Sequence, residues 1–277
     1  MSAAITRRAG RGNMVSVPRL FHSRFSDRCG IEQDVREASG YVRTFFRGIR
    51  VKRMKTDYPG HDDAYRRLRT EGAAGWGRTE ADYDEQRRRL RRILESGYAP
   101  RQGRLLELGC GAGNVAIWLA RQGYEVVGVD IAPTAIEWAR SKALAEGVRA
   151  EFLVGDVLDL SSVADAWFDF VLDGHCFHCI IEDDRSRFLA EALRVLRPGG
   201  FLLVDTMCGP VAGGRLPGYD EASRCTIRDG IATRYFGSSD DIKGEVESAG
   251  FRILALEFEA GDINGNLTIQ AEKPRRV

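Results

Sequence analysis

The sequence of 277 residues has no apolar run near the ~18 residues that a membrane-spanning helix needs. Its N-terminus also lacks the compact apolar stretch of a secretory signal. Six cysteines are too dispersed in a chain of this length to form a disulfide framework, which favours a reducing compartment. No segment repeats. We therefore expect a cytoplasmic protein that has no membrane partner.

The net charge is also close to zero, because 40 Asp and Glu residues offset 41 Lys and Arg residues. This balance conceals a division of the chain. Residues 1–56 hold 13 basic and 4 acidic side chains, a net +9, and the remainder carries −8. We predict a basic extension over residues 1–53 and a mildly acidic body over residues 54–277. An acidic body has no general affinity for polyanions, so we do not expect it to bind nucleic acid.

Three interpretations of the basic extension stay open. A leader rich in Arg and Ser, with no acidic residue before Asp27, has the composition of an organellar transit peptide. A basic arm can also hold nucleic acid through its phosphates. We favour the third interpretation, a disordered or partly helical tail, or else a natural chain start at Met54, because composition alone is weak evidence.

Residues 57–100 predict two helices and a loop between them. Asp62 or Asp63 is the expected cap of the first helix, and Thr79 that of the second. The loop places Trp76 between Gly75 and Gly77. A lone aromatic on a flexible loop suits a lid over a ligand, and the alternative is an anchor on the surface.

From residue 104 onward, short apolar strands alternate with helical stretches, which is typical of a parallel sheet covered by helices on both faces. We predict an α/β fold with a Rossmann-like, doubly wound sheet of about seven strands and a C-terminal antiparallel hairpin. The expected strands are 104–108, 125–130, 150–154, 168–173, 201–205, 251–258 and 267–272. The expected helices are 114–122, 133–146, 184–196 and 239–249, the last capped by Ser239 or Asp240.

The most informative segment runs from Glu107 to Gly113 with the sequence ELGCGAG, directly after a strand and opening a helix. Glycines there allow close approach to a ligand, and the helix start offers free amide groups. Asp130 and Asp156 end the next two strands. All three positions lie at carboxyl ends of adjacent strands, where open α/β sheets bind their ligands. A dinucleotide site would need a final glycine where Asn114 stands.

At this point residues 104–206 resemble a class I S-adenosylmethionine-dependent methyltransferase. Residues 107–113 match the first motif of that family, 127–131 the second, 155–157 the third, and 196–201 the loop before its fifth strand. The resemblance implies S-adenosyl-L-methionine as cofactor. It further implies that the ribose binds to Asp130 and the adenine amino group to Asp156. The residues implied to hold the cofactor, from its methionine end to its adenine end, are Glu107, Gly109, Gly111, Asp130, Ile131, Asp156 and Val157.

The segment after the fourth strand, from Asp173 to Cys179, would face the transferable methyl group. His175 or His178 are candidate bases that remove a proton from an acceptor, and local packing is the alternative role for each. The spacing His-Cys-x-His-Cys invites a metal interpretation. Four neighbours on one strand-to-helix turn cannot all converge on one ion without strain, so we expect no metal site.

A second, weaker resemblance links this segment and Gly75-Trp76 to the thiol, halide and thiopurine methyltransferases. It adds Trp76 and Asp173 to the implied cofactor-binding set, although Gly174 stands where that group has an arginine. Residues 207–237 read as a Gly-rich insertion on the acceptor side. Six of its residues could meet an acidic or aromatic substrate: Arg215, Tyr219, Arg224, Arg228, Arg234 and Tyr235.

We expect a methyltransferase that acts on a small-molecule acceptor by direct displacement. Two alternatives stay open, a nucleic-acid methyltransferase that uses the basic arm, and a protein that binds the cofactor without methyl transfer. The oligomeric state is also open, with a homodimer among the alternatives.

Overall fold

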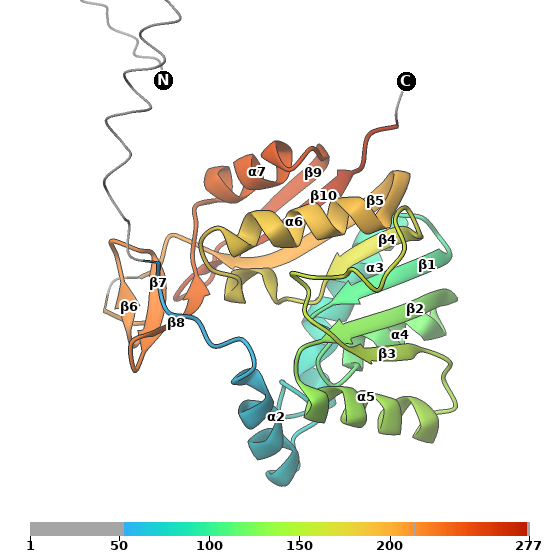
Figure 1. Cartoon of the computed structure of the whole chain (residues 1–277), viewed down its shortest axis with the longest axis horizontal. Coiled ribbons are helices and arrows are strands. Elements are labelled where there is room, and N and C mark those ends of the chain that lie inside the picture. The colour runs from blue at the N-terminus through green and yellow to red at the C-terminus, as the bar shows by residue number, and fades with distance from the viewer. Residues whose placement is uncertain (1–52, 213, 276–277) are drawn as a thin grey trace, which may run out of the picture. The chain divides into compact units, whose positions relative to one another are not determined.

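A computed structural model describes residues 53–212 and 214–275, shown in colour in Figure 1. The predictions about the basic extension, whether leader, nucleic-acid arm or tail, lie outside the described residues. Residues from Arg53 onward belong to one compact unit, to which the following description is confined.

A seven-stranded sheet forms the centre of this unit, with the strand order β3–β2–β1–β4–β5–β10–β9 (Figure 1). Strand β10 runs antiparallel to both of its neighbours, and the pairs among β1 to β5 are parallel. The predicted doubly wound sheet with a C-terminal antiparallel hairpin is thereby confirmed. The strands are β1 (Gly103–Leu108), β2 (Tyr124–Asp130), β3 (Glu151–Val154), β4 (Phe168–Asp173), β5 (Leu196–Cys208), β9 (Arg252–Glu259) and β10 (Gly265–Glu272).

Helices cover both faces of the sheet. They are α2 (His61–Thr70), α3 (Asp84–Glu95), α4 (Asn114–Arg121), α5 (Pro133–Ala145), α6 (Asp184–Val195) and α7 (Ser239–Ser248), with 3₁₀ turns at Glu80–Tyr83 and Phe177–Cys179. Successive strand residues point to opposite faces. Leu105 therefore packs with α3, α4 and α5, whereas Leu106 packs with α6 and α7. Within residues 53–212 and 214–275, no helix combines the length and the apolar character needed to cross a bilayer.

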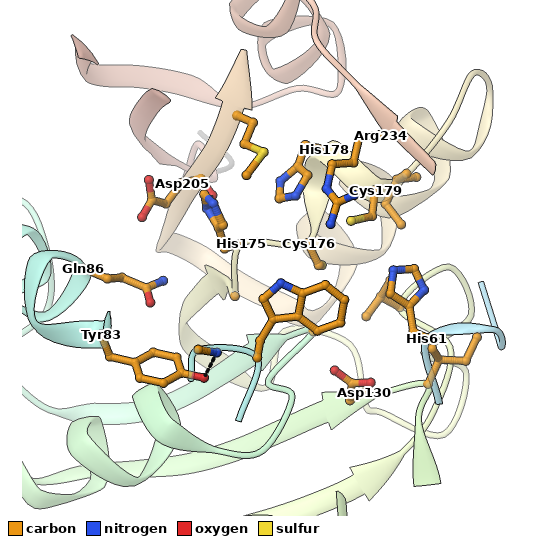
Figure 2. A pocket seen from close by; sticks show the side chains of 18 of the residues that line it. His61, Tyr83, Gln86, Asp130, His175, Cys176, His178, Cys179, Asp205 and Arg234 are labelled. Carbon is orange, nitrogen blue, oxygen red and sulfur yellow. Dashed lines mark hydrogen bonds between the residues drawn. The ribbon is translucent and has the colours of Figure 1, made fainter. Parts of the chain in front are cut away.

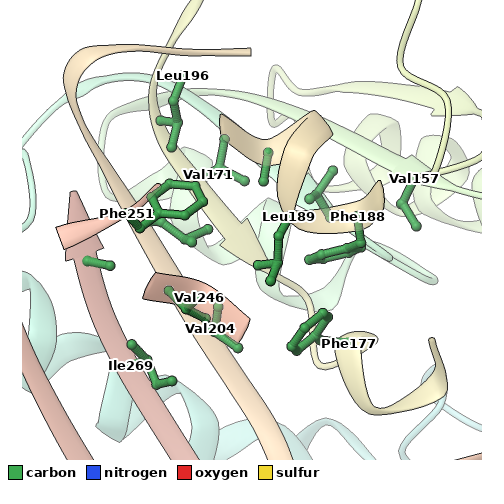
Figure 3. Packing of buried hydrophobic residues seen from close by; sticks show 14 of the residues in the cluster. Val157, Val171, Phe177, Phe188, Leu189, Leu196, Val204, Val246, Phe251 and Ile269 are labelled. Atoms are coloured by element: carbon green, nitrogen blue, oxygen red, sulfur yellow. The ribbon is translucent and has the colours of Figure 1, made fainter. Parts of the chain in front are cut away.

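The core on the α6 and α7 face is built from aliphatic and aromatic side chains that are almost completely buried (Figure 3). Phe188 and Leu189 of α6 lie over Val171 of β4, and Val246 of α7 lies near Val204 of β5. Burying each such side chain contributes about 1.5–3 kcal/mol. This packing holds the strands in fixed register, so the loops at their carboxyl ends have fixed positions.

The start of α2 differs from the sequence prediction. Gly60 is the N-cap, and neither Asp62 nor Asp63 caps the helix. The Oδ1 atom of Asp62 instead accepts a hydrogen bond of 2.7 Å from the backbone N–H of Thr134 in α5. The carboxylate thus joins two helices that are distant in sequence. Local spacing cannot distinguish this contact from a cap.

Two other predicted caps have different outcomes. Thr79 caps the 3₁₀ turn at Glu80–Tyr83, where its backbone N–H donates to Asp82 Oδ2 at 3.1 Å, and not α3 itself, whose N-cap is Tyr83. Helix α7 is capped by Ser238, whose hydroxyl accepts from the Asp241 N–H at 3.1 Å. The predicted cap at the following one or two residues was therefore wrong.

The insertion contains a small antiparallel sheet that the sequence did not predict. Its strands are β6 (Tyr219–Asp220), β7 (Cys225–Arg228) and β8 (Ile231–Tyr235), in the order β6–β7–β8. The turn between β7 and β8 places Asp229 and Gly230 at positive φ angles of 50° and 75°. Asp-Gly is a characteristic hairpin-turn sequence, but strands this short carry little periodicity of their own.

Candidate active site

A cavity of about 520 Å³ lies at the carboxyl ends of the parallel strands (Figure 2). Strand β2 contributes Asp130 at its end, the turn after β4 contributes His175, and β5 contributes Asp205. Side chains from α2, α3, β8 and β10 complete the wall. This is the edge where open α/β sheets bind ligands, as the sequence predicted.

The glycine-rich turn after β1 brings the backbone close to the cavity. Gly109 and Gly111 have φ angles of 73° and 52°, which glycine adopts at low cost. A Cβ atom on Gly109 would lie 2.7 Å from the Cys176 sulfur. A Cβ on Gly111 would collide with the Tyr65 hydroxyl. The turn therefore needs glycine at both positions.

Asp130 lies at the end of β2 and is anchored by two backbone groups. Its Oδ2 accepts from the Gly111 N–H at 2.8 Å, and its Oδ1 from the Ala132 N–H at 2.9 Å. Burial raises the pKa of this carboxyl, and the two N–H groups oppose that shift. Each carboxylate oxygen has a second acceptor site, so both can still accept a hydroxyl. A ribose diol fits this arrangement.

Glu107 is 2% exposed, and its Oε2 has no hydrogen-bond partner among the described residues. Burial, followed by the negative charges of Asp130 and Asp173, raises the pKa of Glu107 well above its usual value. A buried carboxyl oxygen without a partner is costly. An ammonium group beside it would satisfy the oxygen and lower this pKa. The α-amino group of a methionine moiety fits that need.

Three more predicted cofactor residues line the same cavity as Gly109 and Asp130: Ile131, Asp156 and Val157. Glu107 and Gly111 line a smaller pocket that shares Gly109 with this cavity. The Oδ1 atom of Asp156 accepts from the Leu158 N–H at 2.9 Å, which orients its carboxylate on the turn after β3. The structure thus brings together residues from three strand ends. Strands β1, β2 and β3 are neighbours in the sheet, so an extended ligand could lie across their three ends in that order.

Trp76 reaches over the cavity from the loop between α2 and the 3₁₀ turn, and its side chain is 46% exposed. Its ring meets Tyr65 edge-on at a centroid distance of 5.5 Å and His61 at 6.0 Å. An exposed aromatic with contacts on one side only is placed to cover a ligand. This geometry is compatible with the predicted lid.

Asp173 does not line the cavity. It is completely buried, and its Oδ1 accepts from the N–H groups of Cys176 and Phe177 at 2.8 and 3.0 Å. Burial raises its pKa to about 6. The carboxyl group therefore supports the turn that carries His175, and it lies behind the wall of the cavity.

The two histidines pack edge-on against each other at the acceptor end of the cavity, with ring centroids 4.8 Å apart. The Nδ1 atom of His175 lies 2.8 Å from the Asp205 carbonyl oxygen, which can only accept. Nδ1 therefore carries the proton in the neutral ring, and Nε2 remains an acceptor. His178 is 4% exposed, and burial lowers its pKa well below the usual value. Both predicted bases thus reach the cavity.

A buried ionic network that the sequence did not predict closes another side of the cavity. Arg89 of α3 donates to both carboxylate oxygens of Asp205 at 2.9 Å and to Glu259 at 2.8 Å. Asn266 of β10 donates to Asp205 Oδ1 at 2.7 Å. One signal was available, because Asp205 interrupts the apolar strand 201–204. Its partners lie far away in sequence and had no signal.

Other lining residues were also missed. They include Tyr58, His61 and Tyr65 from the N-terminal segment, Tyr83 and Gln86 at the start of α3, and Met207 at the acceptor end. Cys179 and Arg234, which the sequence did offer as candidates, line the cavity as well. Among residues 53–212 and 214–275, no three His, Cys, Asp or Glu side chains gather in an arrangement that could hold a metal ion.

Comparison with known proteins agrees with this geometry. Residues 106–204 match the family model described as a methyltransferase domain. The S-adenosyl-L-methionine-dependent Diels-Alderase iccD of Talaromyces variabilis is 32% identical over 66% of this chain and 64% of its own. The demethylmenaquinone methyltransferase of Thermus thermophilus is 39% identical over 45% of this chain and 54% of its own. The chain thus spans less than two thirds of either relative.

A solved structure extends the likeness in fold. The 1,6-didemethyltoxoflavin-N1-methyltransferase of Burkholderia thailandensis superimposes with a TM-score of 0.55 at 20% identity, over 90% of this chain and 93% of its own. Together with the motif order and the sheet topology, these matches identify the class. Residues 106–204 carry a methyltransferase domain, in agreement with the class I S-adenosylmethionine-dependent methyltransferase that the motifs predicted.

Proposed function

We propose that this protein transfers a methyl group from S-adenosyl-L-methionine to a small-molecule acceptor. One observation carries the proposal. A single cavity is lined by Asp130, Asp156 and Gly109 of the cofactor motifs and, at its other end, by His175 and His178. Cofactor and acceptor can therefore meet in one enclosed space.

The bound cofactor would supply a sulfonium methyl group, which is open to direct displacement. The protein's own task is then to align the acceptor and exclude water. Glu107 and the backbone at Gly109 and Gly111 would hold the methionine part, and Asp130 the ribose. The adenine would lie among Ile131, Asp156 and Val157, beneath Trp76.

His175 is the better placed of the two candidate bases. Its Nδ1–H is committed to the Asp205 carbonyl, so its Nε2 is free to accept a proton from a hydroxyl, thiol or amine. His178 is buried and lacks a partner for Nδ1 among the described residues. We propose that His178 shapes the acceptor end as a neutral ring.

Calorimetry with S-adenosylhomocysteine tests the cofactor assignment. Asp130→Ala should weaken binding by about one to two powers of ten, because charge-assisted hydrogen bonds contribute about 1.5–3 kcal/mol. Asp262→Ala, at an exposed carboxylate in the β9–β10 turn, is the matched control. Unchanged affinity of the Asp130 variant would overturn the assignment. Screening thiols, halides, phenols, amines and carboxylates for release of S-adenosylhomocysteine then identifies the acceptor class.

A second candidate function is cofactor binding without methyl transfer, which the name of the Diels-Alderase relative favours. It predicts tight binding of S-adenosylmethionine with no release of S-adenosylhomocysteine for any acceptor. The remaining alternative, methylation of nucleic acid, depends on residues 1–53. It predicts that deleting these residues weakens catalysis and removes a steep salt dependence of binding. Under our proposal the shortened protein keeps its activity.

A further inference from the structure

One basic residue of the insertion reaches the cavity, and the others do not. Arg215 donates to the Asp262 carbonyl at 2.9 Å, and Arg224 pairs with Asp241. Arg228 is exposed at the end of β7. Arg234, one residue before the end of β8, lines the cavity wall beside His178 and Cys179 (Figure 2).

The guanidinium of Arg234 has no counter-charge within the described part of the chain. No carboxylate there lies within ion-pair distance of it, although it is partly shielded from solvent. Its neighbours are neutral near pH 7. Burial raises the pKa of the Cys179 thiol to about 11, and burial lowers the pKa of His178 well below its usual value.

The other charged side chains of the cavity wall already have partners or lie on the side of the cofactor motifs. Asp82 accepts from the Thr79 N–H, and Glu85 accepts from Arg88. Arg89 is bound to Asp205 and Glu259, so it is not available to an acceptor. Asp130 and Asp156 lie on the side of the cofactor motifs. The acceptor end therefore presents one uncommitted positive charge, next to a buried imidazole whose Nδ1 has no partner among the residues described.

We propose that the acceptor carries one carboxylate and that Arg234 binds it. This inference rests on the proposed function, because it concerns the acceptor end of the same cavity. A guanidinium presents two N–H groups in the planar geometry of a carboxylate, and pairing removes the cost of a half-buried lone cation. One free cation balances one negative charge, which favours a carboxylate over a phosphate dianion.

The other residues of the cavity wall indicate the chemical character of the rest of the acceptor. Met207, Ile180 and Tyr58 are apolar or aromatic, and Trp76 lies over the opening. Such a wall suits a flat or apolar body that bears the carboxylate at one end. The nucleophilic atom of the acceptor would then lie on the side that faces His175.

Matched pairs of carboxylic acids and their carboxamides test the proposal, because each pair differs in charge and hardly in shape. The full-length protein is first saturated with S-adenosylhomocysteine. Binding of a panel that includes 4-hydroxybenzoate, anthranilate and cinnamate, each with its amide, is then measured by calorimetry. We expect at least one acid to bind tenfold or more tightly than its amide.

Arg234→Gln should remove that preference without changing the affinity for S-adenosylhomocysteine, and Arg234→Lys should keep part of it. Arg228→Gln, on the same small sheet but exposed, is the control and should behave as the unmodified protein. The proposal is overturned if no acid is preferred, if the preference survives in Arg234→Gln, or if matched phosphonates bind more tightly. Failure of the unmodified protein to bind S-adenosylhomocysteine would instead contradict the proposed function.

Discussion

The Nη1 atom of Arg89 lies 2.9 Å from both carboxylate oxygens of Asp205, and this buried pair joins α3 to the end of β5. The side chains are 11% and 3% exposed. Because Asp205 also offers its carbonyl to His175, the pair connects the packing of α3 with the orientation of a candidate base.

Removing one member of this pair should therefore be costly. Arg89→Met leaves a buried carboxylate with only Asn266 as a charge-stabilising partner, and we expect a loss of about 3 kcal/mol in the free energy of unfolding. Arg92→Met is the control, since Arg92 meets Glu257 and Glu259 at 3.5 Å on the surface, where such pairs contribute below about 1 kcal/mol. Urea unfolding measures both. Equal losses for the two variants would contradict the importance of the Arg89–Asp205 pair.

The glycine-rich turn leads to a second prediction. Gly111→Ala should destabilise the protein by the cost of a positive φ, about 1–2 kcal/mol, and by the clash with the Tyr65 hydroxyl. Adding Tyr65→Phe removes that hydroxyl and should restore part of the stability and of the cofactor affinity. Gly97→Ala is a matched control, because Gly97 has a φ of 89° but open space around its Cα. If Tyr65→Phe restores nothing, the clash is not the cause.

The buried carboxyl of Asp173 predicts a dependence of stability on pH. Its folded pKa of about 6 lies above the value near 3.9 of an unfolded Asp, so the folded state binds the proton more tightly. Its contribution to stability is greatest at low pH and is lost as the pH rises from about 4 through 6. Asp173→Asn keeps the oxygen that accepts from Cys176 and Phe177.

We therefore expect Asp173→Asn to be more stable than the unmodified protein at pH 8, by up to about 3 kcal/mol. This advantage should shrink as the pH falls from 6 toward 4. Unfolding by urea at pH 8, 6 and 5 measures the difference, with Asp262→Asn as an exposed control. An advantage that stays constant over this range would rule out titration of Asp173 as its source.

The neutral state of His178 gives a fourth prediction, about activity. Because burial holds its pKa well below the usual value, its ring stays neutral between pH 7 and 9. His178→Gln should lower kcat/KM by a factor that is the same at every pH in this range. His175→Gln is the comparison, since a general base at that position would alter the shape of the profile. A changed profile in His178→Gln would assign the proton transfer to His178 instead.

Much of the fold could be predicted because strands and helices each require a characteristic local pattern of apolar residues in the sequence. Short apolar strands alternate with amphipathic helices, and β4 has the bounds that were predicted, Phe168–Asp173. The position of the cavity could be predicted from the same pattern, since parallel strands bring the residues after their carboxyl ends to one edge of the sheet. Asp130 and Asp156 line the cavity for this reason.

Contacts between distant segments could not be predicted in this way. Arg89 and Asp205 are 116 positions apart, and a basic residue on a helix normally faces water. Asp173 ends its strand just as Asp130 does, but its side chain lies behind the cavity wall. There it accepts hydrogen bonds from the backbone N–H groups of Cys176 and Phe177, which belong to the turn that follows it. The sequence pattern predicts which edge of the sheet carries the site, but it does not predict the direction in which each side chain points.

The sequence by itself therefore determined the class of fold, the succession of strands and helices along the chain and the chain positions of the cofactor motifs, because periodicity and turn chemistry act over a few residues. Tertiary structure alone decided that Arg234 of the small sheet reaches the cavity while Arg215 and Arg224 find other partners. Its orientation depends on the pairing of β7 with β8 and on where that sheet meets the turn after β4. Those contacts join segments that are far apart in the sequence, so no local periodicity predicts them.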